Sequence, residues 1–134
     1  MNDLINAYLE TDYFINRFKL PLKIGIKSIE LEKIFKKHKI KSASYITAYN
    51  PYSKILNELE NKERNKDLFL LRKDYTCIEG IGKHPSNEWE GEPSFLFLGM
   101  NLEIAKQIGK KYEQNAILWI DEDAIPQIVI LRTL

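Results

Sequence analysis

The chain has 134 residues, 44% of them hydrophobic, and a formal net charge of +1. This length holds one domain with its own core and is too short for two, so we expect a single domain over residues 1–134. The nearly balanced charge excludes a strong overall field toward nucleic acid or a membrane surface. No apolar stretch approaches the roughly 20 residues that cross a bilayer.

The single cysteine, Cys77, is too little for a disulfide framework or a four-ligand zinc site, and its apolar neighbours predict a buried structural thiol. The first residues include the acidic Asp3 and lack a basic segment followed by a long apolar run, which disfavours a secretory signal. We therefore expect a cytoplasmic protein with no membrane partner.

The N-terminal part of the chain predicts a short helix over residues 3–9 and two strands over residues 11–15 and 22–26. Short apolar runs bounded by turn residues are typical of strands. The two strands would form a hairpin, with Pro21 at its margin, where a missing backbone donor is tolerated.

Ser28 is a typical helix N-cap, and it precedes an apolar face with helical spacing. The pattern predicts a helix that ends near Lys39, with His38 packed on the apolar face. Residues 43–49 predict a strand covered on both faces. This strand would end at Asn50, because a residue before proline avoids helical backbone angles.

The middle of the chain predicts a helix over residues 61–73, preceded by a looser, exposed stretch. Residues 75–78 predict a strand that leads into a glycine-rich loop, EGIG at residues 79–82, and then into a polar loop up to residue 93. Residues 94–98 (SFLFL) form a continuous apolar run, which is typical of a strand covered on both faces.

Asn101 is the expected N-cap of a third helix, and Asn115 is expected to end it in the left-handed conformation. Residues 116–120 and 127–131 then predict two strands that form a closing hairpin. Together these elements predict an α/β (α+β) fold. It is a single compact domain with a mixed β-sheet of about six to seven strands, about three helices packed on it and hairpins at both ends.

Several motifs occur together in a particular order: AYLETDYF, YITAYNPYS, EGIG, W-x-x-EPS and QNAILWI. In these motifs, which span nearly the whole chain, the sequence resembles the bacterial family catalogued as domain of unknown function 3293. The resemblance implies a small single-domain bacterial cytoplasmic protein, and it implies no particular activity. The residues that match the family's motifs are Tyr13, Thr47, Tyr49, Asn50, Pro51, Asn61, Arg64, Gly80, Gly82, Trp89, Glu92, Ser94, Gly99, Gln114 and Asn115.

The polar loop over residues 79–94 contains the first candidate site, formed by Glu79, Trp89, Glu92 and Ser94. A carboxyl group beside a tryptophan in a glycine-rich cleft loses hydration, which raises its pKa and suits a general acid or base. Glu92 is therefore the candidate catalytic residue. The alternative is structural, with Glu92 anchoring the loop by accepting backbone N–H bonds.

Polar side chains at the ends of two other elements complete this candidate site. Tyr49 and Asn50 end the strand over residues 45–49, where Tyr would stack on a ligand and Asn would bind an amide or base edge; a turn is the alternative. Asn115 is expected to be a helix C-cap, whereas Gln114 needs hydrogen-bond partners from the protein or from a ligand.

Asn61 and Arg64 lie one helical turn apart, and with Arg72 they are candidates to bind a phosphate or carboxylate; a solvated helix face is the alternative. The basic run over residues 36–41 lacks interleaved aromatic residues and a recognised nucleic-acid module, which disfavours nucleic acid as a partner. The histidines and the acidic turn over residues 121–123 form no metal-ligand pattern, so no metal site is predicted. No motif identifies a cofactor or a reaction.

The leading hypothesis is a small bacterial cytoplasmic domain that binds a small polar or anionic ligand. The ligand would lie in a cleft formed by the 79–94 loop, the end of the 45–49 strand and the 114–115 helix end. Glu92 would be the polar anchor or the acid/base, and Trp89 would be a stacking wall.

The alternative hypothesis is a protein–protein interaction module with no ligand chemistry. In that case the docking surface is the final strand over residues 127–131 or the loop that carries Trp89. An exposed edge strand favours pairing with another chain, so this hypothesis predicts self-association through the edge.

Overall fold

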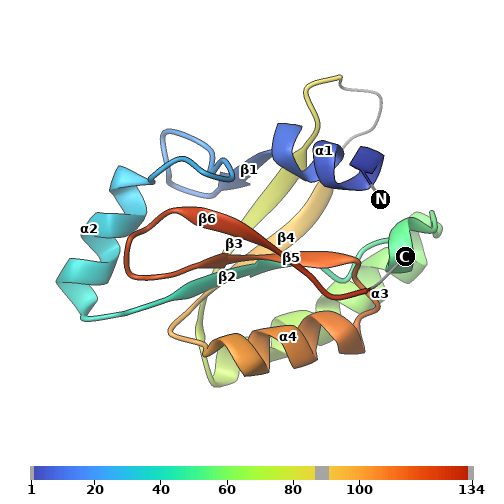
Figure 1. Cartoon of the computed structure of the whole chain (residues 1–134). Helices are drawn as coiled ribbons and strands as arrows, with labels where there is room; N and C mark the ends of the chain where they lie inside the picture. The colour runs from blue at the N-terminus through green and yellow to red at the C-terminus, as the bar shows by residue number, and fades with distance from the viewer. Residues whose placement is uncertain (1, 87–90, 133–134) are drawn as a thin grey trace.

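The computed structural model describes residues 2–86 and 91–132. Within these residues the chain forms a single six-stranded sheet with the strand order β1-β3-β4-β2-β5-β6 (Figure 1). The strands are β1 (Asp12–Ile15), β2 (Ala43–Ile46), β3 (Thr76–Lys83), β4 (Glu92–Leu98), β5 (Ala116–Ile120) and β6 (Pro126–Ile130). The predicted α/β (α+β) class is confirmed. Every pairing of these strands is antiparallel, however, so the sheet is not mixed.

Helices cover both faces of the sheet. The α-helices are α1 (Asn2–Glu10), α2 (Ile29–His38), α3 (Glu58–Phe69) and α4 (Leu102–Lys111), and two short 3₁₀ helices follow at Pro51–Ser53 and Leu70–Lys73. Figure 1 shows α3 and α4 below the sheet and α1 above it. The layers therefore leave β2 and β4 in the interior of the molecule.

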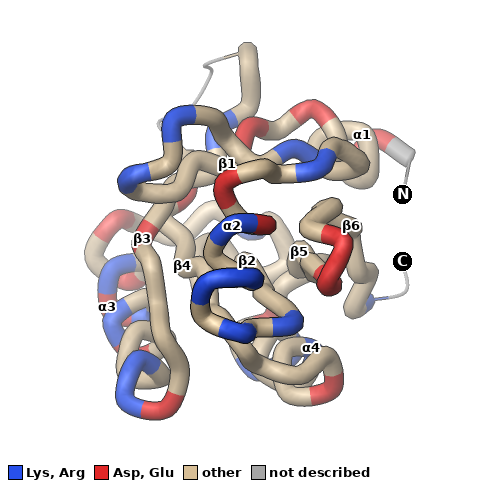
Figure 2. The backbone as a smooth tube through the Cα atoms, turned by 90° about the vertical axis from the view of Figure 1, so that its left-hand side faces the viewer, with Lys and Arg blue, Asp and Glu red and all other residues tan. Residues whose placement is uncertain are grey.

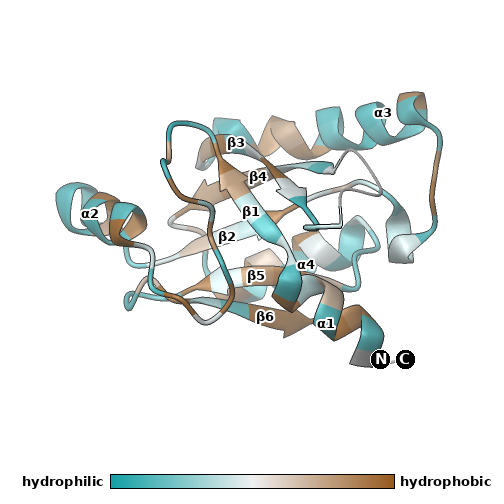
Figure 3. Cartoon of the chain, turned by 90° about the horizontal axis from the view of Figure 1, so that it is seen from above, coloured by the Kyte–Doolittle hydropathy of each residue, from teal (hydrophilic) through white to brown (hydrophobic). Residues whose placement is uncertain are grey.

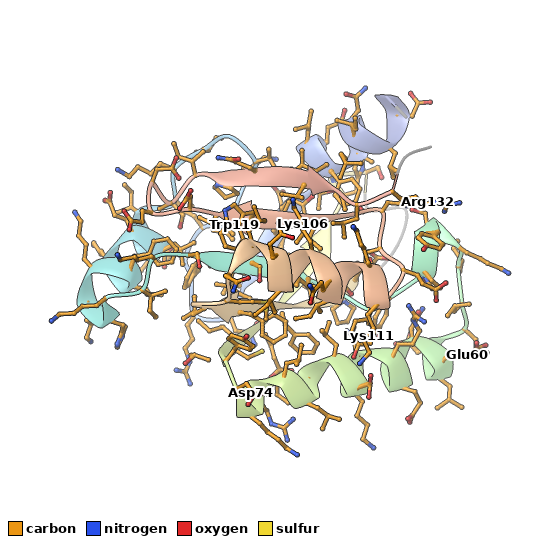
Figure 4. All side chains as sticks on the ribbon, turned by 60° about the horizontal axis from the view of Figure 1, so that its bottom comes forward. Glu60, Asp74, Lys106, Lys111, Trp119 and Arg132 are labelled. Carbon is orange, nitrogen blue, oxygen red and sulfur yellow. The ribbon has the colours of Figure 1, made fainter. Side chains whose placement is uncertain are left out.

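Each face of the sheet has its own hydrophobic core. Alternation along β4 divides its apolar residues, with Leu96 in the core on the α2 side and Phe95 and Phe97 in the core on the side of α3 and α4. On the latter side the Phe69 and Phe95 rings stack with centroids 5.1 Å apart. The view in Figure 4 shows α3 and α4 side by side under the sheet, with Glu60 and Asp74 at the two ends of the α3 segment. The continuous apolar run of β4 is thus explained by burial on both faces.

Residues 22–28 join the two edges of the sheet, which is curled. The backbone of Leu22 exchanges hydrogen bonds of 2.8 and 3.0 Å with Tyr13 in the edge strand β1. A few residues later, the N–H of Gly25 donates to the carbonyl of Pro126 in the other edge strand, β6, at 2.9 Å. The strand predicted over residues 22–26 is therefore only a pair of isolated bridges, because the segment turns between two partners at Gly25, whose φ is 84°.

The N-cap residues Ser28 and Asn101 predicted from the sequence mark the starts of α2 and α4. The Ser28 hydroxyl accepts from Leu31 N–H at 3.1 Å, and the Asn101 side chain accepts from Ile104 N–H at 2.9 Å, so both predicted caps are confirmed. The sequence did not predict the N-cap of α3. The Asn57 side chain accepts from Glu60 N–H at 2.8 Å, so α3 begins at Glu58 rather than at residue 61.

The structure corrects the expectations for His38, for Asn115 and for the end of the strand predicted over residues 43–49. His38 is exposed rather than packed on the apolar face of α2. The left-handed residue after α4 is Glu113, with φ of 57°, and not Asn115. The strand predicted over residues 43–49 ends at Ile46, because the segment that follows is bound by side chains instead of by a neighbouring strand.

The glycine-rich loop predicted at residues 79–82 is part of β3. This strand pairs with β1 from Ile15↔Gly80 onward and with β4 up to Gly82↔Glu92. A β-carbon placed on Gly80 would lie 2.0 Å from the carbonyl oxygen of Phe14, whereas one on Gly82 would make only ordinary contacts, the nearest at 3.6 Å. Close approach of the β1 backbone, rather than a loop, therefore requires glycine at position 80.

Gly80→Ala should lower the free energy of unfolding by about 2 to 3 kcal/mol, because the new methyl group overlaps the β1 backbone. Gly82→Ala, the matched control in the same strand, should change it by less than about 1 kcal/mol. Urea denaturation of the two variants measures both values. Equal losses in the two variants would contradict the close-approach explanation.

Candidate functional site

A cavity of about 610 Å³ lies between α1, the adjoining face of the sheet and the segment from Thr47 to Asn61. Its size falls in the usual range of small-molecule sites, about 300 to 1,000 Å³. The walls come from α1 (Leu4, Ala7, Tyr8), from the inner positions of the sheet (Tyr13, Tyr45, Leu118) and from the chain after β2. Figure 3 shows α1 near one end of the sheet, while α2 lies at the opposite end.

Glu92 is the half-buried carboxyl group of this cavity. It begins β4 opposite Gly82, and its Oε2 accepts a hydrogen bond from Asn50 Nδ2 at 2.9 Å. Burial raises the pKa of Glu92, and the Asn50 hydrogen bond opposes part of that rise. Within the part of the chain that the structure describes, Glu92 forms no ion pair. Its carboxyl group is therefore held by a neutral amide.

Four tyrosines that line the cavity are coupled to Glu92: Tyr8, Tyr13, Tyr45 and Tyr49. Burial raises the pKa of each hydroxyl, and the negative charge of Glu92 raises it further, so all four stay protonated at neutral pH. The Tyr13 and Tyr45 rings meet edge to face with centroids 5.4 Å apart. The interior of the cavity thus combines an apolar aromatic wall with hydroxyl groups and the half-buried carboxyl group of Glu92.

Asn50 has little freedom to rotate away from Glu92. Its N–H donates to Asn61 Oδ1 at 2.8 Å, and its Oδ1 accepts from Asn61 Nδ2 at 2.8 Å and from Leu56 N–H at 3.0 Å. The backbone is left-handed, with φ of 45°, a conformation that Asn adopts more readily than most residues. These contacts direct Nδ2 toward the Glu92 carboxylate.

Asn61, Arg64 and Asn65 form what we call the α3 polar face. Asn65 accepts from Ala48 N–H and donates to the Pro93 carbonyl, both at 2.8 Å. Arg64 Nε donates to the Ala48 carbonyl at 2.7 Å, and its Nη2 donates to the Tyr112 carbonyl. The residues predicted as an anion site therefore bind the protein's own backbone.

Gln114 provides a second support for the same segment. Its buried side chain donates to the Tyr49 carbonyl at 3.0 Å and to the Tyr112 carbonyl at 3.1 Å. The partners that the sequence required for Gln114 thus come from the protein, although the residue also lines the cavity. The neighbouring Asn115 donates to the Ser53 hydroxyl at 2.9 Å.

The structure brings most of the predicted site residues together. Those that line the cavity are Tyr49, Asn50, Asn61, Glu92, Ser94 and Gln114. Glu79 does not: it is exposed, its register partner Phe95 belongs to the core on the α3 and α4 side, and it lies beside a separate hollow. Trp89, with Glu88 and Glu90, lies outside the described residues.

Sequence reasoning missed three tyrosines of the site: Tyr8, Tyr13 and Tyr45. Tyr13 and Tyr45 occupy inward positions of short strands, where a sequence pattern predicts aromatic residues of the hydrophobic core. Tyr8 is on α1, for which the sequence predicts only a short helix. The pleat of a strand places successive side chains on opposite faces, which gives the directions of Tyr13 and Tyr45 once the strands are known, but not the cavity that they share with Glu92.

The fold and the site define a small α+β domain with one half-buried carboxyl group, that of Glu92, in a tyrosine-lined cavity. A family model described as protein of unknown function (DUF3293) matches residues 46–117, more than half of the chain. The chain belongs to this family. The match contains Asn50, the α3 polar face, Glu92 and Gln114, whereas α1 and β1 lie outside it. No curated protein and no solved structure matches the chain.

Residues 2–86 and 91–132 contain no group of three or more His, Cys, Asp or Glu side chains that could hold a metal ion. His84 lines the cavity, and its two ring nitrogens have partners. Nε2 is 2.9 Å from Glu10 Oε2, and Nδ1 is 3.0 Å from the Ser86 hydroxyl. Cys77 is half-buried, and burial raises its pKa to about 11, so it is a thiol at neutral pH. No helix among the described residues is long and apolar enough to span a bilayer.

Asn65→Ala should destabilise the protein by about 2 kcal/mol, because it leaves the buried N–H of Ala48 without a partner. Lys66→Ala, at the exposed neighbouring position of α3, is the control and should stay within about 0.5 kcal/mol of the parent. Urea denaturation measures the difference. A loss no greater than that of Lys66→Ala would mean that Asn65 is not required to hold the segment after β2.

Glu92→Gln should flatten the pH dependence of stability. A carboxyl group whose pKa is raised in the folded state binds more protons there than in the unfolded chain, so stability falls as pH rises from the unfolded pKa, about 4.3, through the folded pKa. The glutamine keeps an acceptor for Asn50 and has no charge to bury. We therefore expect the variant to be at least as stable as the parent at neutral pH, and to lose less stability on raising the pH to 7.

Thermal unfolding between about pH 4 and pH 7 tests this expectation, with Glu63→Gln on the exposed side of α3 as the charge-matched control. If the stability of the Glu92 variant and of the parent changed with pH in parallel, this expectation would be contradicted.

Proposed function

We propose that this protein binds a small polar molecule in the cavity, with Glu92 as its principal polar contact. One observation carries the proposal: a carboxyl group stays in a half-buried, tyrosine-lined cavity with a neutral amide as its hydrogen-bond partner. Burying a carboxylate without a cationic partner costs free energy, and such groups with shifted pKa values concentrate at functional sites.

The residues around Glu92 divide into those that contact a ligand and those that position the contacts. Asn50 and Gln114 belong to the second group, because their side chains are bonded to the protein itself. Ser94 belongs there too, since its buried hydroxyl donates to the Glu92 carbonyl at 2.9 Å. The ligand contacts are then the Glu92 carboxyl group and the rings of the tyrosines. In this arrangement Glu92 is an anchor for a hydrogen-bond donor and is the group that would serve as acid or base in any reaction.

An anionic ligand, the other class expected from the sequence, finds less support. Arg64 is committed to backbone carbonyls and to Glu113, 3.6 Å away. Of the charged side chains that line the cavity, Glu58 and Glu92 are acidic. We therefore favour a ligand that is neutral or positively charged. A cytoplasmic location in a bacterium is part of the same proposal.

Pairing through the final strand, the alternative from the sequence, stays a prediction. β6 is at one end of the strand order, and its Ile130 is 39% exposed. The first residue of β6, however, is already bonded through its carbonyl to the N–H of Gly25. This contact shortens the free edge, so ligand binding is the better supported function.

A thermal-shift screen tests the proposal, with a panel of nucleotides, sugar phosphates, amino acids and common cofactors. A ligand at about 100 times its dissociation constant should add about 2.7 kcal/mol of stability. Ala7→Phe, which places a ring in the α1 wall of the cavity, should remove the shift. Asn6→Phe, which adds the same ring at the exposed neighbouring position, should keep it.

A ligand whose shift survives in Ala7→Phe as well as in Asn6→Phe would bind elsewhere on the molecule. A panel without any shift, together with concentration-dependent self-association, would favour the interaction module instead.

A further inference from the structure

The charges at the cavity are unevenly distributed. Its described lining includes the carboxyl groups of Glu58 and Glu92 and contains no Lys or Arg. Figure 2 shows the blue segments of Lys and Arg on the helices α2, α3 and α4 and in the loops. The net charge of +1 does not reveal this difference between the cavity and the outer surface. His84, the one lining residue that becomes cationic on protonation, already faces Glu10 on α1. The interior of the cavity therefore favours positive charge.

The two carboxyl groups also share an aromatic neighbour. Tyr49 donates to Glu58 Oε1 at 3.3 Å, and Glu92 is the second negative charge that acts on its hydroxyl. Glu58 lies at the exposed rim, whereas Glu92 lies inside. Aromatic rings attract cations through their π faces, so a cation near Glu92 would be stabilised by both the carboxylate and the tyrosines.

We propose that the ligand is an organic cation, with an ammonium group against Glu92 and an apolar or aromatic body against Tyr8, Tyr13 and Tyr45. This inference rests on the proposed function of the same cavity and names the chemical class of its ligand. An ammonium group supplies three donors and the counter-charge that no described residue gives Glu92. A carboxylate or phosphate ligand would instead meet two negative charges and no Arg or Lys.

Three probes of similar size separate charge from shape: benzylamine, benzyl alcohol and benzoate. Each is titrated into the full chain at neutral pH, and NMR shifts of the cavity residues report both the site and the dissociation constant. Benzylamine should bind at least about tenfold more tightly than benzyl alcohol, and benzoate should bind most weakly.

Two variants locate the cation. Glu92→Gln should weaken benzylamine about tenfold and leave benzyl alcohol within about twofold, because it removes the charge but keeps an acceptor for Asn50. Glu58→Gln at the rim should weaken benzylamine less. Glu63→Gln removes the same charge from an exposed position of α3 that does not line the cavity, and it should leave all three affinities unchanged.

The outcomes distinguish this inference from the function on which it rests. Benzyl alcohol or benzoate shifting the cavity residues as strongly as benzylamine would overturn the cation and leave small-molecule binding in place. A benzylamine preference that persists in Glu92→Gln would also overturn it, because the ammonium group would then lie elsewhere. If no probe shifts any cavity residue, both the inference and the proposed function fail.

Discussion

The structure depends on how the backbone of residues 48–50 is satisfied after it leaves the sheet. These residues follow β2 without a neighbouring strand, yet Ala48 and Tyr49 are buried. Side chains take the place of the missing strand, with Asn61, Arg64 and Asn65 of α3 and then Gln114 bonding to successive backbone groups. Buried backbone donors and acceptors need partners, so this set fixes the position of α3 relative to the sheet.

Asn50 connects these contacts to the cavity, because it is bonded both to α3 and to Glu92. Two of its hydrogen bonds go to Asn61, and the next goes to Glu92 in β4, 42 residues away in the sequence. Asn50, Tyr52 and Ser53 all have positive φ, so the chain turns sharply just after it supplies the amide. Such backbone conformations persist when surrounding contacts impose them, and they are often found at ligand sites. The orientation of Glu92 is thus coupled to the packing of α3.

The curl of the sheet supplies the rest of the cavity. Residues 22–28 bond to β1 and to the first residue of β6, and glycine at position 80 lets the Phe14 carbonyl of β1 approach β3 closely. Tyr13 and Tyr45 then point to one side together with Leu118. The family match covers the bonded segment, α3 and Glu92, while the α1 wall lies outside it. The polar side of the cavity is therefore the part that this chain has in common with the family model.

By itself, the sequence determined the elements whose causes are local. The Ser28 and Asn101 caps depend on contacts within three residues, and the apolar run of β4 and the closing hairpin of β5 and β6 appear as short sequence patterns. It also singled out Glu92 from its glycine-rich, tryptophan-containing context, Asn50 from the end of a strand, and Gln114 because a polar residue between buried elements needs partners.

The tertiary structure decided what depends on distant residues. In the folded chain Gly80 and Gly82 lie in the strand β3, and Arg64 donates to backbone carbonyls. The tyrosines line the same cavity as the Glu92 carboxyl group. The reason is that strand pairing and hydrogen bonds between distant residues depend on which segments lie next to each other in space. Residue type alone does not specify those neighbours. The sign of the charge that a ligand would need is a property of this arrangement, not of the composition.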